Sequence, residues 1–425
     1  MTHINCRFDF HPVGQGLFYS GQINDFHFVY DCGARPGKQY AQAALASYKA
    51  PDAPLDLLII SHFHEDHTNA VEDLLRKVRG VKEVIIPYLF PAERLLVGAG
   101  YAFANDLDEL SDDYISFLND PVGYLTDFGA GEAAFTFLRS GDAVEEWPDA
   151  GEQVAGNYGW YPEAPESSPD DADEILRRSN VSLRLHSSIY RAPQWGFKFY
   201  CKPGKASAAD IQKELLALTS PIDVKDIPRV LKNRLKDLKG VYKKLFKSHK
   251  DQNNTSVVCC HGPARPRRTT RDVLYGVARV ALSMSSPGLT PLPLRSSVCF
   301  SGHYLFDMHG YWRAEDNRPF LLPPLQLLTG DANIIPKEYQ THFTSELDAI
   351  GLALLPHHGS KHNWDNVFPS MMPNCMLWVA SSGLGNKDKH PNTEVVKSVV
   401  DAKRQLVLCN EIQHVAISVD GWRQP

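Results

Sequence analysis

Residues 61–67 read Ser-His-Phe-His-Glu-Asp-His and directly follow the apolar run Leu-Asp-Leu-Leu-Ile-Ile of residues 55–60. Three histidines and an aspartate therefore stand together at the end of a predicted buried strand. Neutral imidazole and carboxylate are the ligands that borderline divalent cations such as zinc prefer. Because burying these groups without a partner would cost stability, the stretch predicts a metal site formed by His62, His64, Asp66 and His67.

The spacing within this stretch offers two groups of ligands. His62 and His64 flank Phe63, so in an extended or turning segment both imidazoles can reach one side. Asp66 and His67 come as the chain turns into a helix predicted for residues 68–78, which is enough for two adjacent metals. The alternative is a polar loop with unrelated histidines, but the crowded spacing in a strand–turn–helix context favours the metal site.

Composition bounds the class of protein. The chain has 425 residues, 43% of them hydrophobic, and a formal net charge of −6, so it is not a uniformly basic nucleic-acid binder. The eight cysteines form no Cys-x-x-Cys pair and are expected to be reduced thiols. No apolar window approaches the length of a membrane span and the first residues lack a signal-peptide core. We therefore expect a cytoplasmic protein without a membrane segment.

Strand and helix patterns alternate over the first 90 residues, which predicts an α/β fold with strands at 8–19 and 26–31 and a helix at 38–49. Strand patterns return after residue 253, and no internal repeat of fixed period occurs. We therefore expect one domain, 1–425, with an acidic, loop-rich insertion at 100–175 and a basic, helical insertion at 204–250. In the second insertion an apolar stripe follows helical spacing, formed by Leu231, Leu235, Leu238, Tyr242 and Leu245.

The histidine stretch resembles the His-x-His-x-Asp-His signature of the metallo-β-lactamase superfamily. Further matches follow in the family's order along the chain: a first hairpin at 13–16 and 30–33, Gly330-Asp331, His357-His358-Gly359-Ser360, and Asn386 with His390-Pro391. The combination is most similar to the hydrolase domain of the ComEC DNA-uptake proteins. The resemblance implies an αβ/βα sandwich of two mixed sheets flanked by helices, with the two insertions added to it.

The resemblance also implies a dinuclear centre that holds two divalent ions, with Zn²⁺ favoured over Mn²⁺. Asp331 would bridge the two ions, and either His357 or His358 would reach the second ion, with His358 favoured. Asp66 would orient a metal-activated hydroxide, while His357 or His390 would protonate the leaving oxygen.

This sequence departs from the superfamily at one ligand. The segment Asn253-Asn254-Thr255-Ser256 resembles a strand of the ComEC-like branch, where most other relatives carry a histidine. His186, His261 and His303 are candidates for the missing ligand of the first metal, or water completes it. The candidates for substrate binding are Asn254, Ser256, Ser360 and Lys361.

Three functions fit these observations. The first is a phosphodiesterase or nuclease acting on nucleic acid or a nucleotide, for which the basic stretch 225–250 is either a polyanion-gripping arm or a solvated helix. The second is hydrolysis of a small ester, thioester or lactone. The third is a non-catalytic binding module that docks a protein partner through its insertions. The sequence leaves the oligomeric state open.

Overall fold

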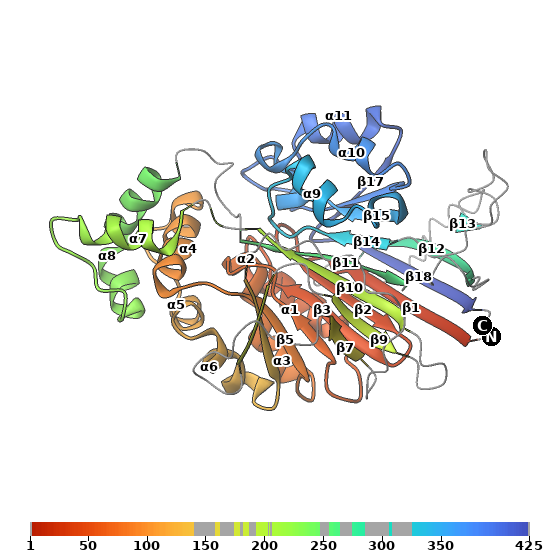
Figure 1. The fold of residues 1–425 in the computed structure, drawn as a ribbon, viewed down its shortest axis with the longest axis horizontal. Helices are drawn as coiled ribbons and strands as arrows, with labels where there is room; N and C mark the ends of the chain where they lie inside the picture. Colours follow the sequence, from red (N-terminus) through yellow and green to blue (C-terminus); the bar gives the residue numbers. More distant parts are fainter. Residues whose placement is uncertain are drawn as a thin grey trace.

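Two mixed β-sheets stacked face to face form the body of the molecule in the computed structural model (Figure 1). The structure describes residues 2–139, 158–161, 174–178, 182–186, 193–202, 204, 206–246, 255–263, 274–284, 306–307 and 325–423. The predicted fold class, a sandwich of two mixed sheets flanked by helices, is confirmed.

The first sheet is antiparallel around the chain termini and parallel from β3 onward. Its described strands follow the order β13 (Phe306–Asp307), β12 (Leu274–Met284), β18 (Gln413–Arg423), β1 (Thr2–Phe10), β2 (Phe18–Ile23), β3 (Phe26–Cys32), β4 (Leu57–Ile59), β5 (Glu83–Pro87), β6 (Ala134–Arg139) and β8 (Glu174–Arg178).

The second sheet is parallel over its first four strands and antiparallel beyond them. Its described strands follow the order β17 (Gln405–Cys409), β16 (Leu377–Ser381), β15 (Ile350–Leu354), β14 (Leu325–Leu328), β11 (Val257–Pro263), β10 (Pro193–Cys201), β9 (Ser182–His186) and β7 (Tyr158–Tyr161).

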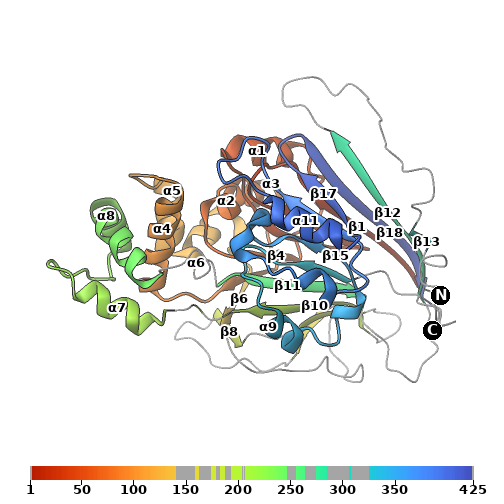
Figure 2. The ribbon, with the colours of Figure 1, turned by 90° about the horizontal axis from the view of Figure 1, so that it is seen from above.

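Helices cover the outer face of each sheet (Figures 1 and 2). The first sheet is covered by α1 (Lys38–Ser47), α3 (Val71–Lys77), α4 (Pro91–Ala104), α5 (Asp112–Asn119) and α6 (Pro121–Leu125). The second is covered by α9 (Pro336–His342), α10 (Phe368–Met371) and α11 (Thr393–Asp401). At one end α7 (Ala208–Leu216) and α8 (Ile227–Leu245) pack beside α4.

The inner faces of the two sheets form an aromatic core. Phe8 and Phe10 of β1 point inward while Asp9 between them faces outward, as the period of two in a strand requires. From the other sheet, Phe197 meets the ring of Phe28 edge to face, with ring centroids 4.9 Å apart. This contact ties the two sheets together at the middle of the sandwich.

Truncating this contact is expected to cost much of the protein's stability. Phe197 is fully buried, and removing a buried Phe side chain costs about 3–5 kcal/mol because the cavity relaxes only partly. Phe197→Ala should therefore lower the midpoint of urea unfolding. Leu384→Ala, at a side chain that is 65% exposed, is the control and should leave the midpoint unchanged. An unshifted midpoint for Phe197→Ala would contradict the inter-sheet assignment.

The structure corrects two boundaries expected from the sequence. The predicted strand 8–19 is two strands, β1 and β2, because the chain turns through a loop at 11–17. The segment 100–175 is not an added insertion of loops. It completes α4, adds α5 and α6, and supplies β6 and β7 to the two sheets, with β8 beginning at Glu174. The acidic residues 140–157 and 162–173 lie outside the described residues.

The described part of residues 204–250 contains the helices α7 and α8. Leu231, Leu235, Leu238 and Tyr242 of α8 are buried against the core beneath α4 and α5, as their helical spacing predicts. In the described part of the chain no helix is long and apolar enough to cross a bilayer. The seven cysteines in that part are all buried and free of disulfides.

Candidate metal centre

The ends of three strands bring the predicted ligands together. Residues 61–64 follow β4 and lead into the short helix α2 (Glu65–Thr68). Asp331 follows β14, and His357 and His358 follow β15. The turn before Asp331 requires glycine, because Gly330 has φ +52° and a Cβ there would lie 2.9 Å from Ser61 Oγ.

The backbone at the histidine pair is strained. His357 and His358 both have left-handed φ angles, 46° and 57°, which cost non-glycine residues of order 1–3 kcal/mol each. Hydrogen bonds from His357 N to Gly330 O and from Ser360 N to His357 O hold this turn. Such strain concentrates where function dictates the direction of side chains.

The two carboxylate oxygens of Asp331 face two different groups of histidines. Oδ2 lies 3.3 Å from His62 Nε2, 3.6 Å from His357 Nε2 and 4.0 Å from His64 Nδ1. Oδ1 lies 3.4 Å from His67 Nε2 and 3.7 Å from His358 Nε2. On the second side, Asp66 Oδ2 is 3.7 Å from His358 Nε2. Asp331 therefore divides the cluster into two compartments and faces both.

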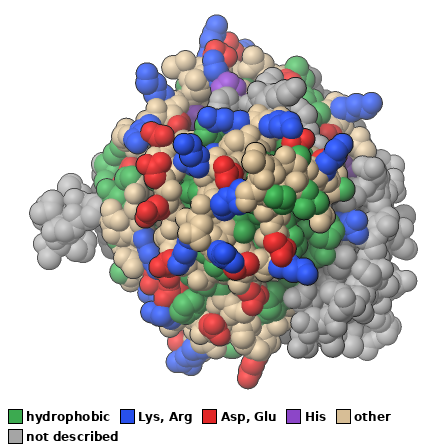
Figure 3. Space-filling model, turned by 90° about the vertical axis from the view of Figure 1, so that its left-hand side faces the viewer, with side chains coloured by type: hydrophobic (Ala, Val, Ile, Leu, Met, Phe, Trp, Pro, Cys, Tyr) green, Lys and Arg blue, Asp and Glu red, His purple; other side chains and the backbone are tan. Residues whose placement is uncertain are grey.

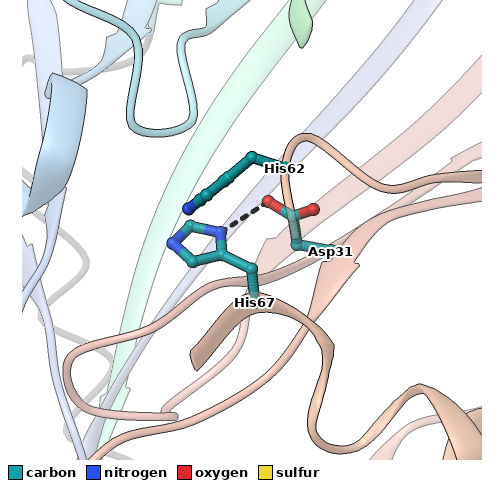
Figure 4. Close-up of side chains that lie close together, drawn as sticks. All are labelled: Asp31, His62 and His67. Carbon is teal, nitrogen blue, oxygen red and sulfur yellow. Dashed lines mark hydrogen bonds and ion pairs between the residues drawn. The ribbon is translucent and has the colours of Figure 1, made fainter. Parts of the chain in front are cut away.

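Hydrogen bonds fix the tautomer of the histidines on the second side. His67 Nδ1 donates to Asp31 Oδ2 at 2.8 Å (Figure 4), and His358 Nδ1 donates to the carbonyl of Ser381 at 2.8 Å. Each ring therefore holds a proton on Nδ1 and turns Nε2 toward Asp331, where a metal can take the place of any proton on Nε2.

The same arrangement holds on the first side. Ser61 Oγ donates to Asp31 Oδ2 at 2.6 Å, so it must accept from His62 Nδ1, 2.9 Å away. Asn363 Nδ2 donates to the carbonyl of Asp331, and Asn363 Oδ1 accordingly accepts from His357 Nδ1 at 3.0 Å. Both rings thus keep the Nε2 lone pair for the centre.

The charges of the site depend on one another. Burial alone would raise the pKa of Asp331, but four neighbouring histidines, with His357 first, hold it well below its usual range. Burial alone would lower the pKa of His67, but Asp331 and Asp31 raise it well above its usual range. Burial lowers the pKa of His64 to about 3. The centre is therefore a set of anionic carboxylates surrounded by imidazoles.

The donor set fits two divalent ions. Nε2 of His62, His67 and His358 and Oδ1 of Asp66 are buried atoms with no hydrogen-bond partner among the described residues, which is costly unless something else satisfies them. Ligand atoms of Asp66, His67 and His358 lie within 4.8 Å of one another, as do those of His62, His64 and Asp66. Nitrogen with carboxylate oxygen suits zinc.

The geometry assigns His357 differently from our expectation. We expected either His357 or His358 to be the ligand, with His358 favoured, and His357 or His390 to be the proton donor. In the structure His357 Nε2 lies near the Asp331 oxygen that also faces His62 and His64. A first ion would be held by His62, His64, His357 and Asp331, and a second by Asp66, His67, His358 and Asp331.

The sequence offered His186, His261 and His303 as candidates for the missing ligand of the first metal. His261 is fully buried in the inter-sheet core, 3.0 Å from the Tyr19 hydroxyl and 3.3 Å from Trp195 Nε1. Burial lowers its pKa to about 3, so it is a neutral core residue and not a ligand. The His186 side chain and all of His303 lie outside the described residues.

A cavity of about 270 Å³ opens beside the centre. Its lining includes six of the predicted site residues, namely His64, Asp66, Asp331, His357, Ser360 and His390. Burial, followed by repulsion from His357 and His358, lowers the pKa of His390 to about 3. His390 is therefore a neutral ring at pH 7, which positions a group or accepts a proton more readily than it protonates a leaving oxygen.

The remaining predicted substrate residues do not meet in this cavity. Ser256 is fully buried beside β11 and Lys361 is exposed, 3.8 Å from Glu394; neither lines the cavity. Asn254 lies outside the described residues.

Sequence reasoning missed Asp31, which orients both halves of the centre. Asp31 is fully buried near the end of β3 and accepts hydrogen bonds from Ser61 N, Ser61 Oγ and His67 Nδ1 at 2.6, 2.6 and 2.8 Å. The sequence gives little indication of this role, because Tyr-Asp-Cys-Gly at residues 30–33 is equally typical of the end of a hairpin.

Asp31→Asn is expected to weaken metal binding by about 10–100-fold, because outer carboxylates that fix a ligand histidine contribute that much. An amide cannot hold the His67 Nδ1 proton as a carboxylate does. Competition with a fluorescent zinc chelator measures the affinity, with Asp56→Asn, another buried strand-edge aspartate, as the control. Equal affinities in both variants would contradict the role of Asp31.

Comparison with known proteins agrees with this site. A family model described as the metallo-β-lactamase superfamily matches residues 14–155, from the first hairpin through the histidine motif. Residues 14–155 are therefore similar to a metallo-β-lactamase superfamily domain, and the two-sheet sandwich agrees with the fold of that superfamily. Most members of that superfamily are metal-dependent hydrolases.

Among solved structures, the chain is similar to the metallo-β-lactamase fold protein YhfI from Bacillus subtilis, with 24% identity and a TM-score of 0.15. That match covers 19% of this chain and 35% of the other, so it spans about a third of that protein's length. No curated protein matches the sequence.

Proposed function

We propose that this protein is a metal-dependent hydrolase that cleaves phosphodiesters, in nucleic acid or in a nucleotide. The observation that supports it best is the placement of Asp331 between two sets of imidazoles, one at each carboxylate oxygen. Paired ions held in this way are used by phosphatases and nucleases for in-line displacement. The resemblance to ComEC-like hydrolases is part of this proposal.

The reaction is a hydrolysis. Water adds to phosphorus, the bond from phosphorus to one ester oxygen breaks, and that oxygen leaves with a proton. Two bound divalent ions would lower the pKa of water from about 15.7 toward about 7 and neutralise charge on the phosphoryl group. Asp66 faces the cavity and can orient the attacking water. His390 holds a neutral ring at the same cavity and can position the ester.

A second candidate is hydrolysis of a small ester, thioester or lactone. It is favoured by the composition of the cavity, where among the described residues Arg35 is the one lysine or arginine in the lining. Arg35 is also engaged, 3.2 Å from Asp388. A phosphodiester would then depend on the metals for most of its charge neutralisation.

The test is a substrate panel with purified protein loaded with Zn²⁺ or Mn²⁺. We expect turnover of bis-p-nitrophenyl phosphate and of a dinucleotide, loss of turnover with EDTA, and no turnover of p-nitrophenyl acetate or an acyl thioester above background. Turnover of the acyl substrates alone would replace the proposal with the second candidate. Two bound ions per chain with no turnover of any substrate would favour a binding module.

A further inference from the structure

The cavity has a wall that the sequence analysis left outside the site. This wall is formed by Gly100 and Tyr101 of α4 and Tyr242 of α8, which line the same cavity as Ser360 and His390. Tyr242 lies in the basic insertion, more than 170 residues after the histidine motif, yet it borders the same cavity as His64 and Asp66. The inserted helix is therefore a part of the site's enclosure.

Packing fixes Tyr242 in this wall. The absence of a side chain at residue 100 makes room for its ring, since a Cβ on Gly100 would lie 2.5 Å from Tyr242 Cε2. The Tyr242 ring also packs on Phe246, with centroids 4.9 Å apart, and is 7% exposed. A side chain held this closely gives the wall a defined position.

The wall is also tied to the metal-binding loop. The ring of Tyr101 lies 5.6 Å from that of His64. Glu65, within the histidine motif, accepts from Ser111 Oγ at 2.8 Å, at the residue before α5. Anything bound at the centre must therefore fit beneath α4 and α8.

The basic residues of α8 mostly hold this wall in place. Lys232 pairs with Asp112 at 2.6 Å, and Lys244 pairs with Glu214. Lys239 donates to the carbonyl of Leu107, and Lys243 lies over the Phe103 ring. On this face basic and acidic side chains are interspersed (Figure 3). Gripping a long polyanion would need a run of uncommitted cations.

Resting on the proposed phosphodiesterase function, we propose that the α4–α8 wall, with Tyr242 in it, limits the substrate to a short phosphodiester, either free or at the end of a chain. A cavity of about 270 Å³ lies just below the range of small-molecule pockets, roughly 300–1,000 Å³. A strand that continues in both directions needs a longer groove and more phosphate contacts than the described residues offer.

The experiment compares three substrates with metal-loaded wild-type protein: a dinucleotide, an end-labelled linear single strand, and a closed circular single strand. We expect cleavage of the dinucleotide, loss of nucleotides from the ends of the linear strand, and kcat/KM at least about 100-fold lower on the circle, a discrimination within reach of steric exclusion. Cleavage of the circle as fast as the linear strand would overturn the proposal while leaving the phosphodiesterase function standing.

Tyr242→Ala removes the Tyr242 ring from the wall and so widens the cavity. It should therefore raise the ratio of kcat/KM for the circle to kcat/KM for the dinucleotide by about tenfold. Tyr242→Leu, which keeps more of the packing, should raise it less, and Tyr40→Ala on α1, away from the cavity, should not change it. An unchanged ratio in a folded Tyr242→Ala protein would count against the wall.

Binding tests the proposal without turnover. Phosphorothioate versions of the dinucleotide and the circle, labelled with fluorescein, can be titrated with metal-loaded protein by anisotropy. We expect the dinucleotide to bind at least about tenfold more tightly. If the circle binds as tightly as the dinucleotide or more tightly, the size limit is overturned, even if no substrate is hydrolysed. If the dinucleotide binds more tightly but neither substrate is hydrolysed, the result counts against the phosphodiesterase function and leaves the size limit standing.

Discussion

Replacing both Asp66 and His67 with alanine is expected to remove the second ion and to abolish hydrolysis. The two side chains supply half of the second compartment, and His358 and Asp331 alone would hold an ion poorly. Loss of several kcal/mol of charge stabilisation in the transition state corresponds to a rate at least roughly 1,000-fold lower. Metal content by plasma mass spectrometry and initial rates on a phosphodiester measure both effects.

The control for this double variant is Asp52→Ala, which removes an exposed carboxylate outside the site. It should keep two ions and full activity. Circular dichroism establishes that the double variant is folded. Hydrolysis at the wild-type rate by a folded double variant would rule out the proposed mechanism, because Asp66 and the second ion would then have no part in it.

Asp331→Asn is expected to cost both ions, which no single histidine substitution should do. The amide keeps the size of the carboxylate but loses its charge, and one of its two terminal atoms becomes an NH₂ donor. The NH₂ group would face the Nε2 atoms of His62 or His67 and could not bind the cation that these atoms would ligate. Affinity for both ions should fall by more than the roughly 10–100-fold that outer residues contribute.

The comparison with His64→Ala makes this prediction specific. His64 approaches only the Oδ2 side of Asp331, so its loss should weaken one ion and spare the other. Asp348→Asn, at an exposed position of a short 3₁₀ helix, should bind two ions as the wild type does. Titration with Zn²⁺ followed by calorimetry resolves the two sites, and one intact high-affinity site in Asp331→Asn would show that the aspartate does not bridge.

The fold class was predictable because its evidence is local. The strand before His62 and the periodic helices beside it fix the strand–turn–helix junction. A sandwich of two sheets then follows from the resemblance and is confirmed. The segment 100–175 was misassigned because its acidic, loop-like composition hides β6, whose place in the sheet depends on pairing with β5, more than 45 residues earlier. Long-range pairing leaves little signature in composition.

The site residues that could be predicted are those where several potential metal ligands stand close together or directly after an apolar strand. Asp331 and the His357-His358 pair stand out as polar groups at the ends of apolar strands, and the structure brings them to the histidine motif. Asp31 and Tyr242 do not stand out, because one reads as a turn residue and the other as part of an apolar stripe. Their roles depend on which side chains tertiary packing places beside them, and spacing along the chain does not record that.

The pairing of β1 with β18 sets the order in which this protein can fold. Thr2 lies opposite Arg423, and the two ends of the chain meet in the same sheet (Figure 1). At a synthesis rate of about 5–20 residues per second, roughly 20–80 s pass between the synthesis of β1 and the synthesis of β18. One edge of β1 stays open during that time, and an open edge invites pairing with other chains. Refolding should therefore be slow, as expected for such distant contacts, and its yield should fall as protein concentration rises.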